Sequence, residues 1–461
     1  MRSIKEILDA KSIAVVGASQ NPFKTGSMLI QVLKEFQFRG DVAGVNPSGG
    51  EIHGVKLYQK LADIPFKVEL VSLIIPPLAV PQALKECAEI GVKGVVISSE
   101  GFAESGENGR IIQDEVAKVL KETGIRAFGP NTLGLVNTET AMTTSYFSNE
   151  QMLEPGSIGF AAQSGIFIGA LLRHIASIEG LRLSKGLGLG NKIDVDESDA
   201  LDYFREDEQT KIIALYLEDI KNGRRFLTAA KKAVSEKPVL LLKGGRTAQG
   251  ATATASHTAS LAVNDTVFDG VLKQAGVLRM ENIEEMIWTL MGFEWMPLPK
   301  GNRIALVTFS GAQAIMSLDM AINEKLVLAK FTDKTKKRLA AVFASAHKTK
   351  NPVDIFPDMM THGFEKISTE TVGALMDDEN VDGIIFITFS DGGTETLKPL
   401  ADLVNKSGTK PVFTTLIGKK EDTAISSQFL LENRIPCFAY PETAVRVFSN
   451  MWKYACVKNL H

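Results

Sequence analysis

The sequence predicts an α/β protein built from parallel sheets, in three consecutive units. Short apolar runs rich in β-branched residues alternate with segments of helical periodicity, which is the pattern of strands joined by crossover helices. The apolar runs are nearly continuous, as expected for strands that are buried on both faces. A chain of 461 residues is also long enough for about three domains, each with its own core.

The first unit is expected to occupy residues 1–130. Helical patterns at 26–36 and 80–90 lie between short apolar runs. The strands predicted from these runs are 13–17, 42–46, 70–75, 94–98 and 126–129.

The second unit is expected over residues 131–296 and the third over 301–461, because the segment between them is rich in turn-forming residues. Both units begin with an apolar strand that runs into Ser-Gly and a helix, in GFAAQSGI and LVTFSGAQ. Both later place Lys-Pro before another apolar strand, in KPVLLLKGG and KPVFTTLIG. These parallels indicate a duplicated α/β domain. The predicted strands are 157–162, 211–218, 238–242, 304–309, 383–388 and 411–416.

Composition argues against several classes of protein. The formal net charge is −3 and no basic tract occurs, so nothing favours a nucleic-acid partner. No apolar run reaches the roughly 18–20 residues of a membrane span, and the opening MRSIKEILDA lacks the apolar core of a signal peptide. The three scattered cysteines are too few for a disulfide framework or a metal cluster. We therefore expect a cytoplasmic protein with no membrane association and no metal site.

The loop after the first predicted strand has the composition of a phosphate-binding turn. It runs from Gly17 to Gly26 and opens a helix, so that glycine backbone and helix N-terminal amides can approach an anion. Lys24 adds a positive charge. This loop predicts a ligand that carries phosphate, and a tight turn without a ligand is the alternative.

Two nucleotide-binding motifs, the dinucleotide fingerprint and the P-loop, are missing, which limits what that ligand can be. The dinucleotide fingerprint needs three spaced glycines and an acid at the end of the second strand, whereas that strand ends Val45-Asn46-Pro47. An acid-free strand end suits a nucleotide with a 3′-phosphate, such as coenzyme A (CoA), better than it suits NAD; an NAD-dependent oxidoreductase stays an alternative. No P-loop of the form G-x-x-x-x-G-K-[ST] occurs, so no ATP site of that type is expected.

His257 is the histidine whose surroundings favour chemistry. It lies in a segment of small residues, 244–260, that we expect to form a loop, and loops often display catalytic groups. A histidine there can be a nucleophile if an acceptor holds the proton of its far ring nitrogen. Glu218 ends a predicted strand at the same sheet edge and is the expected acceptor. The helix that opens at Ser164-Gly165 faces that edge and offers amides to an anion. A flexible loop with one polar histidine is the alternative.

Longer motifs follow one another in a characteristic order along the chain. The first unit contains VGASQNPFKTG, VNP, IIPP, ISSEGFAESGENG and FGPNTLG. The second contains AAQSGI, GLGNKIDVDESDALDYFREDEQTKIIALYLE and LKGGRTAQGATATASHTASLA, and the third contains NPVDIF. Together they resemble the acyl-CoA synthetases that form a nucleoside diphosphate, such as ADP-forming acetate–CoA ligase and succinyl-CoA synthetase. The resemblance extends over essentially the whole chain.

The resemblance implies a fold and a set of site residues. The fold would be an N-terminal Rossmann-like CoA-binding domain followed by two flavodoxin-like, doubly wound domains. His257 would be phosphorylated, and Glu218 would steady it. The residues implied along CoA are Gly17, Ala18, Ser19, Lys24, Asn46, Pro47, Pro76 and Glu100. The residues implied around the phosphate and acyl group are Gly129, Asn131, Gln163, Ser164 and Gly165.

The resemblance also implies a reaction and a partner. Acyl-CoA, ADP and phosphate would be interconverted with carboxylic acid, CoA and ATP through an acyl phosphate and a phosphohistidine. In the family an ATP-grasp domain holds ADP or ATP with Mg²⁺, and no nucleotide motif is found here, so we expect an ATP-grasp β subunit in an α2β2 assembly. Ala259 replaces the usual glycine two residues after the histidine, and 262–265 replaces a glycine-bearing stretch, which leaves acyl preference and loop motion open. A CoA-binding sensor or scaffold without turnover is the alternative function.

Overall fold

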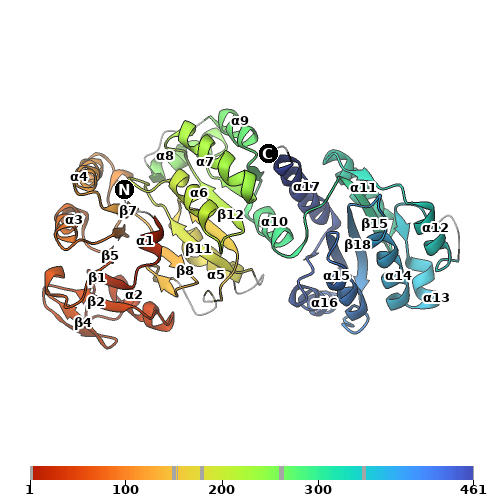
Figure 1. Cartoon of the computed structure of the whole chain (residues 1–461), viewed down its shortest axis with the longest axis horizontal. Coiled ribbons are helices and arrows are strands. Elements are labelled where there is room, and N and C mark those ends of the chain that lie inside the picture. Colours follow the sequence, from red (N-terminus) through yellow and green to blue (C-terminus); the bar gives the residue numbers. More distant parts are fainter. Residues whose placement is uncertain are drawn as a thin grey trace. The chain divides into compact units, whose positions relative to one another are not determined.

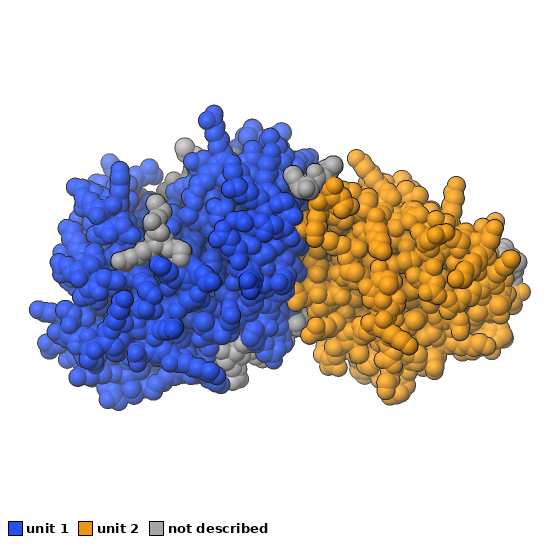
Figure 2. Space-filling model, viewed as in Figure 1, with its two compact units in different colours: residues 1–280 blue, residues 281–461 orange. Residues whose placement is uncertain are grey.

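The chain folds into two compact units of α/β structure. The computed structural model describes residues 4–147, 152, 154–176, 181–258, 264–344 and 349–459, with the backbone alone at 253 and 255–258. Unit 1 comprises residues 1–280 and unit 2 residues 281–461, and Figure 2 shows them in different colours. Unit 1 contains two sheets and unit 2 contains one. The boundaries expected at 130, 296 and 301 stay a prediction.

The first sheet has the strand order β3-β4-β2-β1-β5-β6-β7, and its pairs are parallel except β3 with β4 (Figure 1). Its strands are β1 (Ser12–Val16), β2 (Asp41–Val45), β3 (Gly50–Ile52), β4 (Val55–Tyr58), β5 (Leu70–Leu73), β6 (Gly94–Ile97) and β7 (Arg126–Phe128). Its helical segments are α1 (Ile4–Leu8), α2 (Thr25–Glu35), η1 (Leu61–Asp63), η2 (Pro77–Ala79), α3 (Val80–Glu89), η3 (Ala103–Ser105) and α4 (Glu107–Thr123). Every strand predicted for this unit is present, because each apolar run is buried within the sheet.

The second sheet has the order β14-β13-β12-β10-β11-β8-β9. The strands from β14 to β11 are parallel, whereas β8 and β9 add an antiparallel edge. The strands are β8 (Leu135–Asn137), β9 (Met142–Thr143), β10 (Ile158–Ala162), β11 (Leu183–Gly188), β12 (Ile212–Leu217), β13 (Val239–Lys243) and β14 (Leu278–Met280). The helices are η5 (Phe167–Leu171), which has π-helical geometry, α5 (Leu172–His174), α6 (Glu197–Glu206), α7 (Gly223–Glu236), α8 (Ala248–Thr258) and α9 (Asp265–Ala275).

The sheet of unit 2 has the order β16-β15-β18-β19-β20, with β17 also paired to β15, and all its pairs are parallel. Its strands are β15 (Arg303–Thr308), β16 (Val327–Leu328), β17 (Val353–Asp354), β18 (Gly383–Ser390), β19 (Val412–Gly418) and β20 (Cys437–Phe438). Its helices are α10 (Ile283–Trp295), α11 (Gly311–Asn323), α12 (Asp333–Ala340), α13 (Phe356–His362), α14 (Phe364–Met376), α15 (Lys398–Ser407), α16 (Lys420–Glu432) and α17 (Pro441–Lys458). Helices α10 and α17 pack together in this unit.

The second and third sheets share one topology, as a duplicated domain predicts. In both, the first parallel strand is central, the next strand pairs on one side of it, and the later strands follow in sequence on the other side. The correspondence places β10 with β15, β12 with β18 and β13 with β19. Both copies therefore start a helix directly after the central strand, at Ser164-Gly165 and at Ser310-Gly311.

The prediction that 244–260 forms a loop is wrong, because α8 occupies Ala248–Thr258. The segment was interpreted as flexible because its residues are small, but alanine has the highest helix propensity of all residues. The hydroxyl of Thr247 accepts a hydrogen bond from the amide of Gly250 at 3.0 Å, in the manner of a helix N-cap. A short loop, 244–247, is what separates β13 from this helix.

None of the helices among the described residues combines the length and the apolar character needed to cross a bilayer.

We expect Leu241→Ala to lower the free energy of unfolding by about 2–5 kcal/mol, because Leu241 has no exposed surface in the middle of β13 and the smaller residue leaves a cavity. The matched control is Val267→Ala on α9, whose side chain is 61% exposed and should contribute less than about 0.5 kcal/mol. Urea unfolding of both variants followed by circular dichroism measures the difference. Equal effects would contradict a buried β13.

Candidate active site

Some of the residues expected to bind ligand line a cavity of about 570 Å³ in unit 1. Its lining comes from the loops at the carboxyl ends of strands in both sheets of this unit. The lining residues are Thr25, Ile74, Ser98, Ser99, Glu100, Asn131, Thr132, Leu133, Tyr146, Gln163, Ser164, Gly165, Ile166, Gly190 and Asn191. Five of them, Glu100, Asn131, Gln163, Ser164 and Gly165, are among the residues that the sequence indicated. The cavity therefore lies between loops of the first sheet and the helix start that follows β10 in the second sheet.

The loop after β1 approaches the end of β5 very closely. Gly17 has a φ of +94°, and a Cβ atom there would lie 2.0 Å from the carbonyl oxygen of Ile74, so only glycine fits. The amide of Ser19 donates to the hydroxyl of Ser27 at 3.1 Å, which ties the loop to the first turn of α2. Lys24 is the residue that immediately precedes this helix. The loop is thus held in the shape of a backbone cradle at a helix N-terminus.

Asn46 holds this loop in place through its side chain. Its amide group donates to the carbonyl oxygen of Ala18 at 2.7 Å, and its side-chain oxygen accepts from the amide of Ser48 at 2.9 Å. Both ends of the Asn46 side chain are therefore engaged within the protein. Pro47 follows it, and Pro76 precedes the short helix η2. Neither proline lines the cavity.

Ser99 is a residue of the cavity wall that the sequence analysis did not single out. Its hydroxyl donates to the carbonyl oxygen of Ile75 at 2.5 Å and accepts from the amide of the same residue at 3.1 Å. The amide of Asn131 donates to the carbonyl oxygen of Ser99 at 2.9 Å. Ser99 thereby joins the loops after β5, β6 and β7. It lies in the quoted motif ISSEG, but a serine between strands has no distinctive spacing that would identify it.

The turn at 188–192, which follows β11, contacts the first sheet through Asn191. The Asn191 side chain donates to Glu104 Oε2 at 2.6 Å and to Gln113 Oε1 at 2.9 Å, and its backbone amide donates to the carbonyl oxygen of Pro130 at 2.9 Å. Glu104 Oε1 also accepts from the amides of Gly101 and Phe102. Burial alone would raise the pKa of Glu104, but the hydrogen bonds from Asn191 and from the backbone outweigh it and lower that pKa.

Gln163 is a structural support as well as a wall of the cavity. It is 5% exposed, and its side-chain oxygen accepts from the amides of Glu218 and Asp219 at 2.9 and 3.2 Å. The side chain of Gln163 therefore fixes the strand end that follows β12. Directly after it, the helix that continues into η5 begins at Gly165, where a Cβ atom would lie 2.8 Å from Leu133.

Glu218 lies at the predicted edge, one residue beyond β12, and is 7% exposed. The hydroxyl of Tyr216 donates to Glu218 Oε1 at 3.3 Å, and the Tyr216 ring stacks on Phe167 with ring centroids 3.9 Å apart. Burial, followed by the charge of Glu218, raises the pKa of Tyr216, so the phenol stays protonated and acts as a donor. A Cβ atom at Gly244 would lie 2.6 Å from the Tyr216 hydroxyl, which explains a glycine at the end of β13.

His257 lies in the last turn of α8, and its side chain is outside the described residues. The expected contact between His257 and Glu218 thus stays a prediction. Helix α8 begins four residues after Gly244 and packs against η3, the short helix that contains Glu104. The backbone of the predicted phosphohistidine segment is therefore close to both sheets of unit 1.

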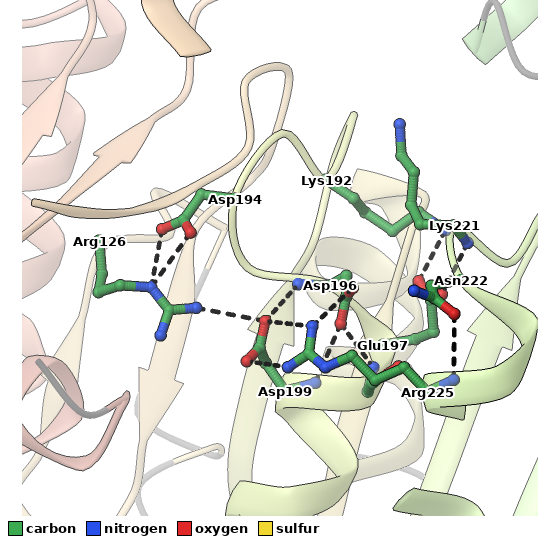
Figure 3. A network of polar contacts seen from close by, with 10 residues as sticks. Arg126, Lys192, Asp194, Asp196, Glu197, Asp199, Lys221, Asn222 and Arg225 are labelled. Carbon is green, nitrogen blue, oxygen red and sulfur yellow. Dashed lines mark hydrogen bonds and ion pairs between the residues drawn. The ribbon is translucent and has the colours of Figure 1, made fainter. Parts of the chain in front are cut away.

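An ion-pair network joins the two sheets of unit 1 (Figure 3). Arg126, on β7, is 7% exposed and contacts Asp194 at 2.9 Å and Asp199 at 3.2 Å. Arg225 contacts Asp199 and Asp196 from α7. Asp196 also caps α6 by accepting from the amides of Ser198 and Asp199. The aspartates of NKIDVDESD therefore pair with Arg126 and Arg225, a role that the sequence alone does not indicate.

Comparison with known proteins gives consistent matches over this architecture. Residues 11–138 match a family model described as a CoA binding domain, and residues 155–293 match one described as a succinyl-CoA ligase like flavodoxin domain. The chain is 36% identical to the acetate–CoA ligase [ADP-forming] II subunit alpha of Pyrococcus furiosus, over 94% of this chain and 93% of that one. It is also 36% identical to acetate–CoA ligase [ADP-forming] II of Archaeoglobus fulgidus, covering 98% of this chain and 67% of that longer one.

A solved structure agrees with these matches. The dinucleotide forming acetyl-coenzyme A synthetase 1 of Ca. Korarchaeum cryptofilum, in complex with phosphate and ADP, superposes with a TM-score of 0.91 and 28% identity. The match covers 100% of this chain and 98% of that chain. The predicted order of a Rossmann-like CoA-binding domain and flavodoxin-like domains is confirmed.

We expect Glu104→Gln to lower the free energy of unfolding by about 1–2 kcal/mol at neutral pH, because a partly buried charged acceptor is lost. The pKa of Glu104 is lower in the folded state than its ordinary value of 4.5, so its stabilising effect is complete above that pH and is lost as the pH falls below it. The difference from the wild type should therefore shrink as the pH falls below 4.5. Denaturant titrations at several pH values measure it.

Glu107→Gln is the matched control, since Glu107 is exposed at the start of α4, three residues along the chain. A pH-independent difference for Glu104→Gln would contradict the role given to its carboxylate.

Proposed function

The chain belongs to the family of ADP-forming acetate–CoA ligases, and on this premise we propose that it is the α subunit of an ADP-forming acyl-CoA synthetase. It would interconvert acyl-CoA, ADP and phosphate with a carboxylic acid, CoA and ATP. The observation that best supports this function is the cavity in which the loops after β6 and β7 meet the helix start at Ser164-Gly165 beside Glu218. A ligand attached to the first sheet would present its reactive end to an anion-binding helix start.

CoA would lie along the cradle formed by Gly17, Ala18, Ser19 and Lys24, with Asn46 holding the cradle in shape. Pro47 and Pro76 would border it, and Glu100 lines the cavity. The lowered conformational freedom of this cradle favours binding because little ordering remains to be done when the ligand arrives. The acyl thioester and phosphate would then occupy the space bounded by Gly129, Asn131, Gln163, Ser164 and Gly165.

In the first step, an oxygen of phosphate would attack the thioester carbonyl carbon. The bond between carbon and sulfur breaks, CoA leaves as the thiol after taking a proton, and an acyl phosphate remains. The amides at the start of the helix would stabilise the negative charge that develops on the oxygens.

In the second step, a ring nitrogen of His257 would attack the phosphorus, and the bond between phosphorus and the acyl oxygen would break to release the carboxylate. Glu218 would accept a hydrogen bond from the other ring nitrogen, which keeps its proton, so that the attacking nitrogen is unprotonated. Tyr216 limits the rotation of the Glu218 carboxylate. The phosphoryl group would then pass to ADP.

The nucleotide would be held by another polypeptide. The relatives named as alpha subunits imply a partner subunit, and the Archaeoglobus relative extends well beyond the part that this chain matches. We propose that the partner is an ATP-grasp β subunit that supplies ADP with Mg²⁺ and that the assembly is α2β2.

We expect the isolated chain to acquire label from radioactive phosphate when acetyl-CoA is present and nucleotide is absent, because the two steps above need no partner. The label should be acid-labile and base-stable, and it should be absent from His257→Ala. A filter assay after brief incubation measures it. Absence of label from the wild type, with and without a candidate ATP-grasp partner, would instead support a CoA-binding sensor without turnover.

We expect Glu218→Gln to slow this labelling at least about tenfold, because the amide cannot hold the imidazole proton as a carboxylate does. Its affinity for CoA should be unchanged, since the cradle belongs to the first sheet. Single-turnover labelling and isothermal titration with CoA measure the two quantities. Glu208→Gln is the matched control, because Glu208 is exposed in the turn that precedes β12. A wild-type labelling rate for Glu218→Gln would contradict the role given to Glu218.

A further inference from the structure

Lys192 is a fully buried lysine that the mechanism above does not use. Its side chain has no exposed surface, and neither has that of Glu197, which it contacts at 2.9 Å. It also contacts Asp219 Oδ1 at 2.5 Å and donates to the carbonyl oxygen of Asp219 at 2.9 Å. The ammonium group thus makes one hydrogen bond and two ion pairs. Burying a charge costs several kcal/mol, which only such complete pairing can offset.

The first element that Lys192 holds is the turn 188–192, which lines the cavity. The Lys192 amide donates to the carbonyl oxygen of Leu189 at 3.1 Å and closes the turn. Lys192 itself has a φ of +55°, an uncommon conformation for a residue with a side chain. Gly190 and Asn191, which precede it, are both wall residues of the cavity. The position of this wall depends on where the Lys192 side chain is anchored.

The second element is the strand end that contains Glu218. The amides of Glu218 and Asp219 donate to Gln163, while the carbonyl oxygen and the carboxylate of Asp219 accept from Lys192. The backbone on both sides of the Glu218 side chain is therefore fixed. Burial opposes ionisation of Asp219, but the charge of Lys192 outweighs it and lowers the pKa of Asp219. The ion pair with Lys192 is consequently intact at neutral pH.

Glu197 extends the same anchor to a third element. It is the first residue of α6, and its Oε1 accepts from the amide of Lys221 at 2.9 Å, just beyond Asp219 in the chain. Figure 3 shows Lys192, Glu197 and Lys221 beside the pairs formed by Arg126 and Arg225. Lys192 therefore stands where the cavity wall, the Glu218 strand end and the start of α6 come together.

We propose that Lys192 is a positioning residue of the candidate active site: its buried ammonium group sets the distance between the cavity wall at Gly190–Asn191 and the carboxylate of Glu218. The proposal rests on the proposed function, because it concerns the transfer of the phosphoryl group to His257. Well-packed apolar groups in place of the whole cluster would often stabilise a fold as well as buried ion pairs do, whereas removing the lysine alone leaves its buried carboxylate partners unpaired and lowers stability. What the hydrogen bond and the two ion pairs of Lys192 add is a set position for the two elements.

Lys185 offers a matched control within the same strand and turn. It is 1% exposed at the amino-terminal part of β11, and it pairs with Glu139 and Asp207. Its partners line a different cavity, which contains none of the residues assigned to the candidate active site. Lys185→Met and Lys192→Met therefore each remove one buried lysine charge, and only the second variant disturbs the candidate site.

The experiment is single-turnover labelling with radioactive phosphate and acetyl-CoA, performed on the full chain well below the melting temperature of each variant. Both variants should lose thermal stability. Lys192→Met should in addition label at least about tenfold more slowly per folded molecule, with its dissociation constant for CoA within about threefold of the wild type. Lys185→Met should label at nearly the wild-type rate.

Asp219→Asn keeps the shape of the partner and weakens the ion pair, so it serves as the second variant if Lys192→Met does not fold. It should label several-fold more slowly with unchanged affinity for CoA. Equal labelling rates for Lys192→Met and Lys185→Met, or wild-type labelling by Asp219→Asn, would overturn the positioning role. Absence of label from the wild type would overturn the proposed function itself and the inference with it.

Discussion

The candidate site depends on how the turn at 188–192 is held between the two sheets of unit 1. Asn191 binds Glu104 and Pro130 on the side of the first sheet, and Lys192 binds Asp219 on the side of the second. The turn also lies against the backbone of 130–134 so closely that a Cβ atom at Gly190 would be 2.1 Å from the carbonyl oxygen of Pro130. This one turn thus contacts loops of both sheets, and a change in its conformation would move the parts of the cavity wall that it holds.

Several residues expected to touch ligand have a structural part in the site. Asn46 uses both ends of its side chain to hold the loop after β1, and Gln163 uses its oxygen to hold Glu218 and Asp219. Buried polar groups need partners, and here the partners are the backbones of the loops that form the site. Polar residues in such a motif can therefore contact ligand, or they can support the loops that contact it.

The two copies of the duplicated topology differ in the side chains at the ends of their strands. The position of Gln163 before the Ser-Gly helix start is occupied in unit 2 by Phe309, which packs against Phe389. The strand register places Phe389 and Ser390 of β18 where unit 1 has Glu218 and Asp219. The backbone arrangement is shared, because it depends on apolar strands and helix faces. The chemistry differs, because it depends on a few side chains at the strand ends.

The sequence by itself determined the parallel α/β architecture, the central strands of each sheet and the edge at which Glu218, Gln163 and Ser164 meet. These follow from continuous apolar runs and from the rule that parallel strands end at a common edge. Strands such as β11, with two glycines and the buried Lys185, lack that apolar signal, and α8 was obscured by its small residues. Only the tertiary structure decided that Ser99, Glu104, Asn191 and Lys192 belong to the site, because their partners lie tens of residues away along the chain. Such contacts leave no local pattern: they exist only once the two sheets have been brought together.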